Sequence, residues 1–395
     1  MDNLVEKSTE LGLERQIIKE VGFTRLMTNE LVDVWGEGIP EPNEAEVPEW
    51  TPTKAKPVDL RGEGYGQVWV KDESDPESNP TGTIKDRPAW ELATLYREFA
   101  RTLYMGIRTG EYRVYDGVVH EKKYLSRKWE SVVVPIISVI TSGNEGRALA
   151  RCFEQYKLPP PKLILGADTD KTIVDALKEL RTDLYMVDLS RVDLKPEDIL
   201  RYTNNTANGI DLTSNTTFEP QAIFYDWHVH EAFGEEPDMV FLPFGSGRLM
   251  ENYLYWIMRT VENAKKGVRD PRLTVEPNAI GKIQVLGTEP EQLDSIADKL
   301  PAKFKPFLIF KDTSIDAAVK MKKVAEGTGK YRISEERIKE AHALLLANGF
   351  QAEPSAAAGL ALYLEHFRLG LIDQGKKILV INTGRGLDAA HNTNS

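Results

Sequence analysis

The segment of residues 78–87 places a lysine, Lys85, between a polar turn and a predicted helix. Asn-Pro and Thr-Gly pairs favour turns, and the pattern from Pro88 onward is typical of a helix with proline in its first turn. Lys85 therefore lies near a predicted helix N-terminus, where the macrodipole disfavours an ammonium group. A lowered pKa would leave the amine free for Schiff-base formation. By itself, however, such a lysine is more often a solvated surface residue.

Composition limits what the rest of the chain can be. With 395 residues and 41% hydrophobic content, the chain is long enough for about two or three domains. Its net charge of -11 argues against nucleic acid or an anionic membrane as the main partner. Because there is no apolar run of about 18 residues and the N-terminus is acidic and polar, we expect no membrane helix and no signal peptide, and we predict a cytoplasmic protein. Cys152 is the only cysteine, which excludes an internal disulfide and indicates a packing residue.

Short apolar runs alternate with helix-like segments, as in a doubly wound parallel sheet. The predicted strands are residues 67–71, 132–140, 162–166, 184–187, 238–243, 283–287 and 377–381. The predicted helices begin near Pro88 or cover residues 147–156, 172–181, 220–233, 249–261, 335–348 and 355–369. We predict two α/β domains, a larger discontinuous one (residues 1–85 and 206–395) and a smaller inserted one (residues 86–205). Residues 105–130 are polar and indicate an inserted hairpin or lid.

Three further turns combine glycine with hydroxyl or amide side chains, at residues 141–146, 244–248 and 382–386. Each follows a predicted strand, and ligands of open α/β sheets bind beyond the carboxyl ends of strands. Gly245-Ser246-Gly247 before a helix suits a phosphate, because glycines expose N–H groups and the helix N-terminus is positive. Thr141-Ser142-Gly143-Asn144 suits a small carboxylate and a phenolic oxygen, and Thr383 could offer a hydroxyl to a heteroaromatic nitrogen. Taken singly, these segments could be a tight turn, a helix cap by Ser142 or Asn144, and a simple turn.

Together, these segments resemble a known family. Residues 79–87 (NPTGTIKDR) are similar to the lysine motif of the fold-type II pyridoxal-phosphate enzymes of the tryptophan synthase β-like superfamily, above all the threonine synthases. Residues 141–144 resemble the family's Ser-Ser-Gly-Asn loop and residues 244–249 its phosphate loop. Residues 353–358 resemble its Glu-Pro-x-x-Ala segment, and residues 382–387 its Thr-Gly-x-Gly-Leu ending. The five motifs occur in the family's order over about residues 50–390.

The resemblance implies a fold and a set of roles. The cofactor would be pyridoxal 5'-phosphate, bound in a cleft between two doubly wound domains of a homodimeric enzyme. Lys85 would form the internal aldimine and carry the Cα proton. The backbone of Gly245, Ser246 and Gly247 would hold the phosphate, Asn144 would contact the phenolic oxygen and Thr383 the pyridine nitrogen. Thr141, Ser142, Gly143 and Asn144 would bind the substrate carboxylate.

The implied activity is that of a threonine-synthase-like lyase, which eliminates a substituent from an activated amino acid such as phosphohomoserine and then adds water or another nucleophile. A neutral Thr383 hydroxyl does not enforce protonation of the pyridine ring, which favours elimination over transamination. The alternatives are β-replacement of the cysteine- or cysteate-synthase type, a serine/threonine ammonia-lyase, and a non-catalytic sensor that binds the cofactor or an amino acid.

Some residues depart from the family or have a simpler interpretation. Asp388 and Ala389 stand where the family has Lys-Asp, and Arg147 and Arg248 are additional cations beside two of the loops. We interpret both arginines as ordinary surface charges rather than as ligands of a substrate phosphate. His228 and His230 lack the i, i+4 spacing of helical metal ligands, so we predict no metal site. The acidic cluster of residues 72–77 is predicted to be a solvated loop.

Overall fold

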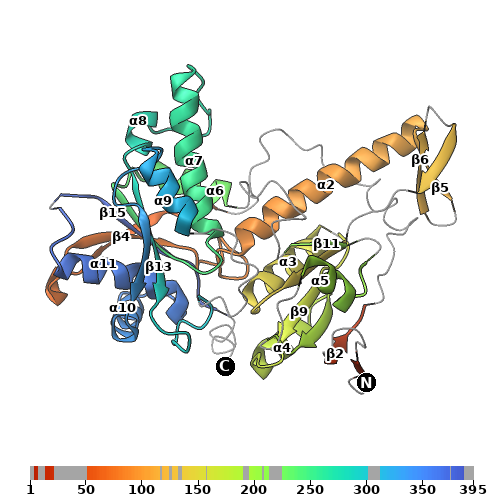
Figure 1. The fold of residues 1–395 in the computed structure, drawn as a ribbon, viewed down its shortest axis with the longest axis horizontal. Coiled ribbons are helices and arrows are strands. Elements are labelled where there is room, and N and C mark those ends of the chain that lie inside the picture. Colours follow the sequence, from red (N-terminus) through yellow and green to blue (C-terminus); the bar gives the residue numbers. More distant parts are fainter. Residues whose placement is uncertain are drawn as a thin grey trace. The chain divides into compact units, whose positions relative to one another are not determined.

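The structure is a computed structural model (Figure 1). It describes residues 4–7, 14–21, 51–115, 118–123, 127–131, 136–156, 158–189, 195–206, 209–212, 225–300, 312–373 and 375–386. The chain divides into two compact units, a smaller one of residues 1–49 and 89–219 and a larger one of residues 50–88 and 220–395. None of the helices among the described residues is long and apolar enough to cross a membrane.

The larger unit is built on a six-stranded sheet with the order β14-β13-β12-β15-β4-β3. Its strands are β3 (Ala55–Asp59), β4 (Gln67–Asp72), β12 (Met239–Pro243), β13 (Gln284–Pro290), β14 (Gly329–Ile333) and β15 (Ile378–Asn382). All neighbours pair in parallel except β3, which pairs antiparallel with β4 at the edge. Every residue of β12 and β15 is buried, as expected of central parallel strands covered on both faces.

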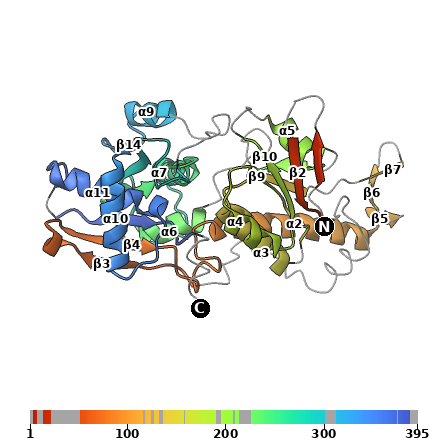
Figure 2. The same ribbon diagram turned by 90° about the horizontal axis from the view of Figure 1, so that it is seen from below.

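Helices surround this sheet. They are α6 (Asp226–Gly234), α7 (Arg248–Lys265), α8 (Pro277–Ile280), α9 (Asp312–Lys320), α10 (Glu335–Ala347) and α11 (Ala358–Arg368). Figure 2 shows α10 and α11 side by side, and α11 packs on β12 with an almost wholly buried surface. Ser334 caps α10 as predicted, because its side chain accepts a hydrogen bond from the Arg337 N–H.

The packing of α6 against α7 leads to a pH-dependent prediction. His230 is buried edge-on against Trp256, and neither of its ring nitrogens has a hydrogen-bond partner among the described residues. Burial lowers the pKa of His230 from 6.5 to about 4, so the ring is neutral in the fold while the unfolded chain binds a proton below pH 6.5. The free energy of unfolding therefore falls as the pH drops from 6.5 towards 4.

We expect His230→Phe to remove this loss, because phenylalanine has a similar shape and does not titrate. The stability difference between variant and wild type should grow by about 2 to 3 kcal/mol between pH 7 and pH 4.5, measured by chemical denaturation. Asp226, whose pKa burial raises to about 6, acts with the opposite sign but is common to both proteins. A difference that does not change with pH would contradict the prediction.

The smaller unit contains a second six-stranded sheet with the order β1-β2-β10-β9-β8-β11. Its strands are β1 (Leu4–Lys7), β2 (Glu14–Lys19), β8 (Ile136–Ile140), β9 (Lys162–Gly166), β10 (Asp183–Val187) and β11 (Gly209–Asp211), and its helices include α3 (Asn144–Gln155), α4 (Lys171–Lys178) and α5 (Pro196–Tyr202). Strands β8 to β11 pair in parallel, and β2 pairs antiparallel with β10. The two parallel sheets with their helices confirm the predicted α/β class.

The N-terminal segment belongs to the smaller unit and not, as predicted, to the larger domain. Residues 1–85 were assigned to the larger domain, whereas β1 and β2 extend the sheet of the smaller unit. Arg15 anchors β2 there, because its Nη1 donates a hydrogen bond of 2.6 Å to the Tyr202 carbonyl oxygen. The physical reason is the edge of β10, which would otherwise expose unpaired backbone groups. This pairing joins residues distant in sequence and leaves no local signal.

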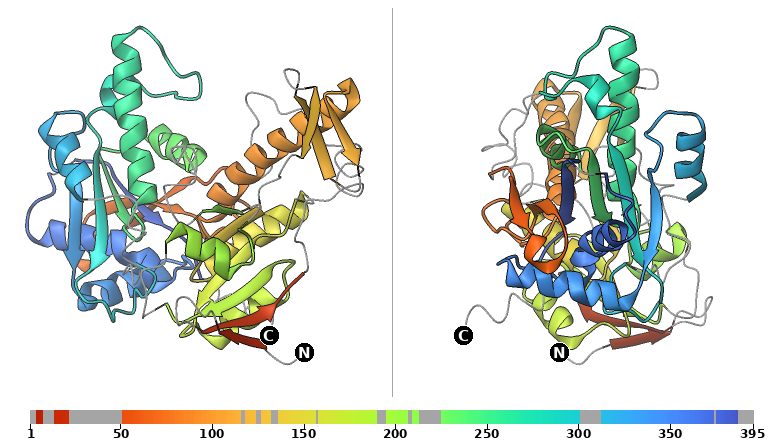
Figure 3. Two further views of the ribbon diagram at one scale, coloured as in Figure 1. Left: turned by 45° about the vertical axis from the view of Figure 1, so that its right-hand side comes forward. Right: turned by 90° about the vertical axis from the view of Figure 1, so that its left-hand side faces the viewer.

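The segment at residues 105–130 forms a separate small sheet. Helix α2 (Asp86–Thr109) runs into β5 (Tyr112–Tyr115), β6 (Val118–Lys123) and β7 (Lys128–Ser131), which pair antiparallel in that order. Figure 3 shows this sheet at the C-terminal end of α2. The predicted hairpin is therefore present among the described residues, although the helix extends further into the insertion than the polar composition indicated.

Candidate active site

Three of the four predicted loops follow neighbouring strands of the larger unit. Strands β12, β15 and β4 are consecutive and parallel, so their carboxyl ends lie at one edge of the sheet. The 244–247 loop follows β12, the 383–386 loop follows β15, and the lysine loop (residues 73–85) follows β4. The tertiary structure thus brings Lys85 to the same edge as the predicted phosphate loop and Thr383, where open α/β sheets bind ligands.

The lysine loop is joined to the 383–386 loop by backbone hydrogen bonds. The Ile84 N–H donates to the Thr383 carbonyl oxygen at 2.8 Å, and the Arg385 N–H donates to that of Gly82 at 3.1 Å. These bonds fix the chain on both sides of the bridge that links the two loops. The position of Lys85 therefore depends on the loop that carries Thr383.

Lys85 immediately precedes Asp86, the first residue of α2, and its side chain is partly buried. The turn before it is held by Thr81, whose N–H and hydroxyl both donate to Asp86 Oδ2 at 2.8 Å. The Lys85 N–H donates to the Thr83 hydroxyl at 3.1 Å. The structure thus places Lys85 at a helix N-terminus, as predicted, in a turn fixed by its own motif.

The 244–247 loop has the properties of an anion site. The Phe244 N–H donates to the Thr288 carbonyl oxygen at 2.7 Å and so ends the strand. Gly247 then adopts a left-handed φ of 80° and begins α7, a long helix whose N-terminus is positive. In the described part of the chain, the N–H groups of residues 245–247 have no hydrogen-bond acceptor. Three such donors at a helix N-terminus suit a phosphate group.

The asparagine loop (residues 141–146) lies in the smaller unit, between β8 and α3. The Thr141 hydroxyl oxygen accepts hydrogen bonds from the N–H groups of Gly143 at 3.1 Å and Gly146 at 3.0 Å. Ser142 is exposed, and Asn144 is buried as the first residue of α3. Among the described residues, neither the Ser142 nor the Asn144 side chain caps the helix, which is the simpler interpretation of this loop. Thr141 holds the turn instead.

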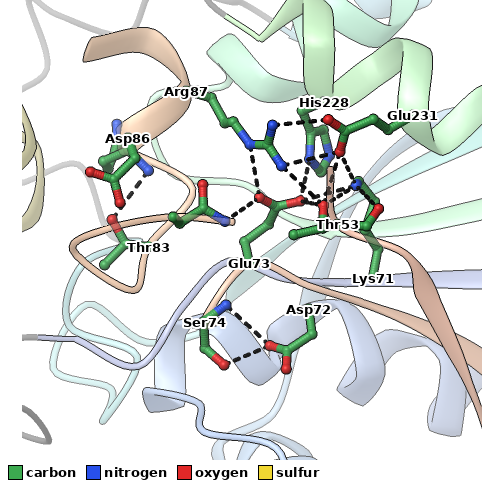
Figure 4. Close-up of polar contacts among 12 residues, drawn as sticks. Thr53, Lys71, Asp72, Glu73, Ser74, Thr83, Asp86, Arg87, His228 and Glu231 are labelled. Carbon is green, nitrogen blue, oxygen red and sulfur yellow. Dashed lines mark hydrogen bonds and ion pairs between the residues drawn. The ribbon is translucent and has the colours of Figure 1, made fainter. Parts of the chain in front are cut away.

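A buried ionic cluster lies next to the lysine loop (Figure 4). The sequence did not predict it. Its members are Thr53, Lys71, Glu73, Arg87, His228 and Glu231. The prediction of a solvated loop at residues 72–77 is wrong for Asp72 and Glu73, which are buried. Burial alone would raise the pKa of Glu73, but the neighbouring Arg87 and Lys71 charges lower it well below its ordinary value. The available signal was the alternation of β4 (Gln67–Asp72), which, continued by one residue, would place residue 73 on the same face as residue 71.

His228 belongs to this cluster rather than to a metal site. Burial lowers its pKa, so the ring is neutral, and Nδ1 lies 2.9 Å from Glu73 Oε1. Across the described ranges, no group of three or more His, Cys, Asp or Glu side chains is arranged to hold a metal ion. Arg147 and Arg248 each interact with other groups of the protein.

Comparison with known proteins identifies the family. Residues 48–384 match the family described as pyridoxal-phosphate dependent enzyme, which is most of the chain. The chain belongs to this family. The match spans the first three loops and ends within the fourth, at Gly384, and it confirms the predicted cofactor, pyridoxal 5'-phosphate. No curated protein matches the chain.

Solved structures of pyridoxal-phosphate enzymes share the fold. Diaminopropionate ammonia lyase from Escherichia coli, in its holo form, is similar with a TM-score of 0.56 and 16% identity over 96% of each chain. The same enzyme with an aminoacrylate–cofactor intermediate gives 0.55 and 16% over 93% of this chain and 91% of that one. A pyridoxal 5'-phosphate-dependent aspartate racemase gives 0.51 and 14% over 87% and 98%. At these identities the similarity shows the fold alone, and the predicted fold-type II architecture is confirmed.

The larger unit fits what a pyridoxal-phosphate enzyme needs. Residues 245–247 offer N–H donors at the start of α7. Lys85 supplies an amine at the same sheet edge. The chemistry of these groups, a phosphate-sized anion site and a primary amine, matches the two ends of the cofactor.

Gly384 leads to a prediction for this pyridoxal-phosphate enzyme. Its φ is 137°, and a Cβ there would lie 2.7 Å from both the Gly82 carbonyl oxygen and the Thr83 Cα. We expect Gly384→Ala to push the lysine loop and the 383–386 loop apart, lowering the free energy of unfolding by about 1 to 3 kcal/mol and the affinity for the cofactor by about tenfold or more. Denaturation and equilibrium titration measure the two effects. Gly375→Ala, at a solvent-facing glycine with space for a Cβ, is the control, and equal cofactor affinity in both variants would contradict the prediction.

Proposed function

We propose that this enzyme is an amino-acid lyase of the threonine-synthase-like type, with Lys85 as the residue that attaches the cofactor. The observation that carries the proposal is the convergence of the lysine loop, the 244–247 loop and the 383–386 loop at the ends of three adjacent parallel strands. When bound, pyridoxal phosphate supplies the electron sink that stabilises a carbanion at the substrate Cα.

Each loop has a role in this proposal. The N–H groups of Gly245, Ser246 and Gly247 would bind the cofactor phosphate, and Asn144 would hydrogen-bond its phenolic oxygen. The substrate carboxylate would be bound by Thr141, Ser142, Gly143 and Asn144. Lys85 Nζ would act as the nucleophile and as the carrier of the Cα proton, because its helix N-terminal position favours the neutral amine.

Thr383 supports elimination as the reaction class. It follows β15, beside the strand that leads to Lys85, and would contact the pyridine nitrogen. A hydroxyl does not fix a proton on that nitrogen as a carboxylate would, so the ring withdraws fewer electrons and transamination is disfavoured. Loss of a β or γ substituent, followed by addition of water or another nucleophile, fits this environment.

A panel of amino acids tests the proposal. The cofactor-loaded enzyme is incubated with phosphohomoserine, phosphoserine, acetylserine, serine, threonine and diaminopropionate, and the release of phosphate, acetate, ammonia and keto acid is measured. We expect phosphate release from phosphohomoserine with formation of threonine. An inactive protein that binds the cofactor would instead support a sensor.

An ammonia-lyase is the second candidate, because two of the similar structures are of diaminopropionate ammonia lyase. Release of ammonia and keto acid from serine, threonine or diaminopropionate, without phosphate release from phosphohomoserine, would favour it over the first. Release of acetate from acetylserine only in the presence of sulfide or sulfite would indicate β-replacement.

A further inference from the structure

We infer that a buried chain of hydrogen bonds, Tyr253–His228–Glu73, is a positioning device that holds Lys85 in register with the phosphate loop. The inference rests on the proposed role of Lys85 and assigns a function to residues that touch neither cofactor nor substrate. All three residues belong to the larger unit, and each is fully buried. Tyr253 lies in α7 and His228 in α6, and Glu73 directly follows β4. Figure 4 shows His228 and Glu73 in contact.

Glu73 holds the lysine loop at two points on either side of Lys85. Its Oε2 accepts a hydrogen bond of 2.7 Å from Asn79 Nδ2 and one of 3.2 Å from Arg87 Nε. Asn79 opens the turn and Arg87 lies in the first turn of α2, so a single carboxylate group ties the beginning of the motif to its end. Moving Glu73 would move both points.

The other oxygen of Glu73 faces α6. His228 Nδ1 lies 2.9 Å from Oε1, and its Nε2 lies 3.0 Å from the Tyr253 hydroxyl. Because Glu73 is ionised and His228 is neutral, Nδ1 carries the proton and donates to Glu73, which leaves Nε2 to accept from Tyr253. Every bond in the chain therefore has a defined direction.

Tyr253 connects this chain to the phosphate loop. It lies in the second turn of α7, whose N-terminus is the 245–247 loop, and a helix transmits position along its axis as a rigid element. The His228 and Tyr253 rings also pack edge to face, with centroids 5.7 Å apart. The positions of the 245–247 loop and of Lys85 are thus linked by side-chain contacts as well as by the sheet.

The charges around these hydrogen bonds favour a single, rigid arrangement. Lys71 Nζ lies 3.2 Å from Glu73 Oε1 and 2.6 Å from Glu231 Oε2, and Arg87 Nη1 lies 2.9 Å from Glu231 Oε1. Two cations and two carboxylates balance, so the neutral ring of His228 is required for electroneutrality. Such a network restricts its members to one arrangement, because any displacement leaves a buried charge unpaired.

The affinities for two ligands distinguish a role in positioning Lys85 from a general effect on the structure. The full-length chain is freed of cofactor and titrated with pyridoxal phosphate and with 4'-deoxypyridoxine phosphate, which has the same ring and phosphate but no aldehyde to react with an amine. The ratio of the two dissociation constants reports how well Lys85 is placed for a ligand held by its phosphate. Borohydride reduction and peptide mass mapping of the loaded wild type verify that Lys85 is the residue attached.

We expect Tyr253→Phe to lower the preference for pyridoxal phosphate about threefold, and Glu73→Gln to lower it about tenfold or more. Affinity for the deoxy analogue should change less than about twofold in Tyr253→Phe. Tyr65→Phe is the matched control, because it removes a hydroxyl that donates to Glu340 at 2.6 Å within the same unit, away from the lysine loop. Its preference should equal that of wild type.

If Tyr253→Phe prefers pyridoxal phosphate over the deoxy analogue as strongly as wild type does, the inference is overturned, even if the variant is less stable. The result for Tyr253→Phe is sufficient if Glu73→Gln does not fold. Equal losses in Tyr253→Phe and Tyr65→Phe would also overturn it. A wild type without preference and without a label on Lys85 would instead overturn the proposed role of Lys85, and the inference with it.

Discussion

Replacing Lys85 by alanine is expected to abolish turnover, by at least about a thousandfold, while leaving the fold intact. The amine is the only part of the lysine loop that can attach covalently to the cofactor aldehyde. The turn itself is held by other groups, namely the Thr81–Asp86 hydrogen bonds and the backbone bonds to the 383–386 loop. The absorbance band of the Schiff base between Lys85 and the cofactor should disappear together with activity.

The measurements are steady-state rates, absorbance spectra and a thermal unfolding curve of each variant. Lys85→Arg is the matched control, since it keeps the positive charge and much of the length but has no primary amine. Both variants should lack this Schiff-base band and be inactive, with near wild-type unfolding. An alanine variant that keeps the band and turns over substrate would show that another residue attaches the cofactor.

Replacing Arg87 by methionine is expected to destabilise the larger unit by about 3 to 5 kcal/mol, a large part of the stability of an ordinary domain. The guanidinium is buried and pairs with Glu73 and Glu231, so its removal leaves two carboxylates facing one ammonium group, that of Lys71. Burial alone would lower the pKa of Arg87, but these carboxylates raise it. Chemical denaturation of the cofactor-free protein measures the loss.

The double variant Arg87→Met/Glu231→Gln tests the cause. It removes one charge of each sign and restores balance, so it should be less destabilised than the sum of the two single variants by about 1 to 3 kcal/mol. Arg61→Met, which removes an arginine exposed beside Asp59, should change stability by less than about 1 kcal/mol. Simple additivity in the cycle would mean that charge balance is not what stabilises this cluster.

Much of the fold could be predicted from the sequence, because the central strands are continuous apolar runs. The strand predicted at residues 162–166 coincides with β9, those at 67–71 and 184–187 each differ from the observed strand by one residue at one end, and that at 377–381 is shifted from β15 by one residue. Parallel strands buried on both faces have this pattern, whichever partners they find. The predicted helix at residues 220–233 falls partly outside the described residues, and its described part is α6.

The sequence could not reveal partners that depend on long-range pairing. The antiparallel strand β2 joins the sheet of the smaller unit by pairing with β10, which lies far along the chain. Glu73 and His228 are likewise 155 positions apart. Charged and polar residues usually lie at the surface. Composition therefore predicts exposure even for charged residues that neutralise one another in the protein interior.

The sequence by itself indicated the kind of chemistry, since the order and types of residues around Lys85, Gly245–Gly247 and Thr383 predict a lysine-bound cofactor with a phosphate. Only the tertiary structure decided that these segments share one edge of one sheet, because strand order is set by pairing among segments that the chain keeps far apart. It also decided what holds Lys85 in place. The lysine motif specifies a turn, but the carboxylate that ties its two ends together belongs to Glu73, which directly follows β4 and is in turn held from α6 and α7.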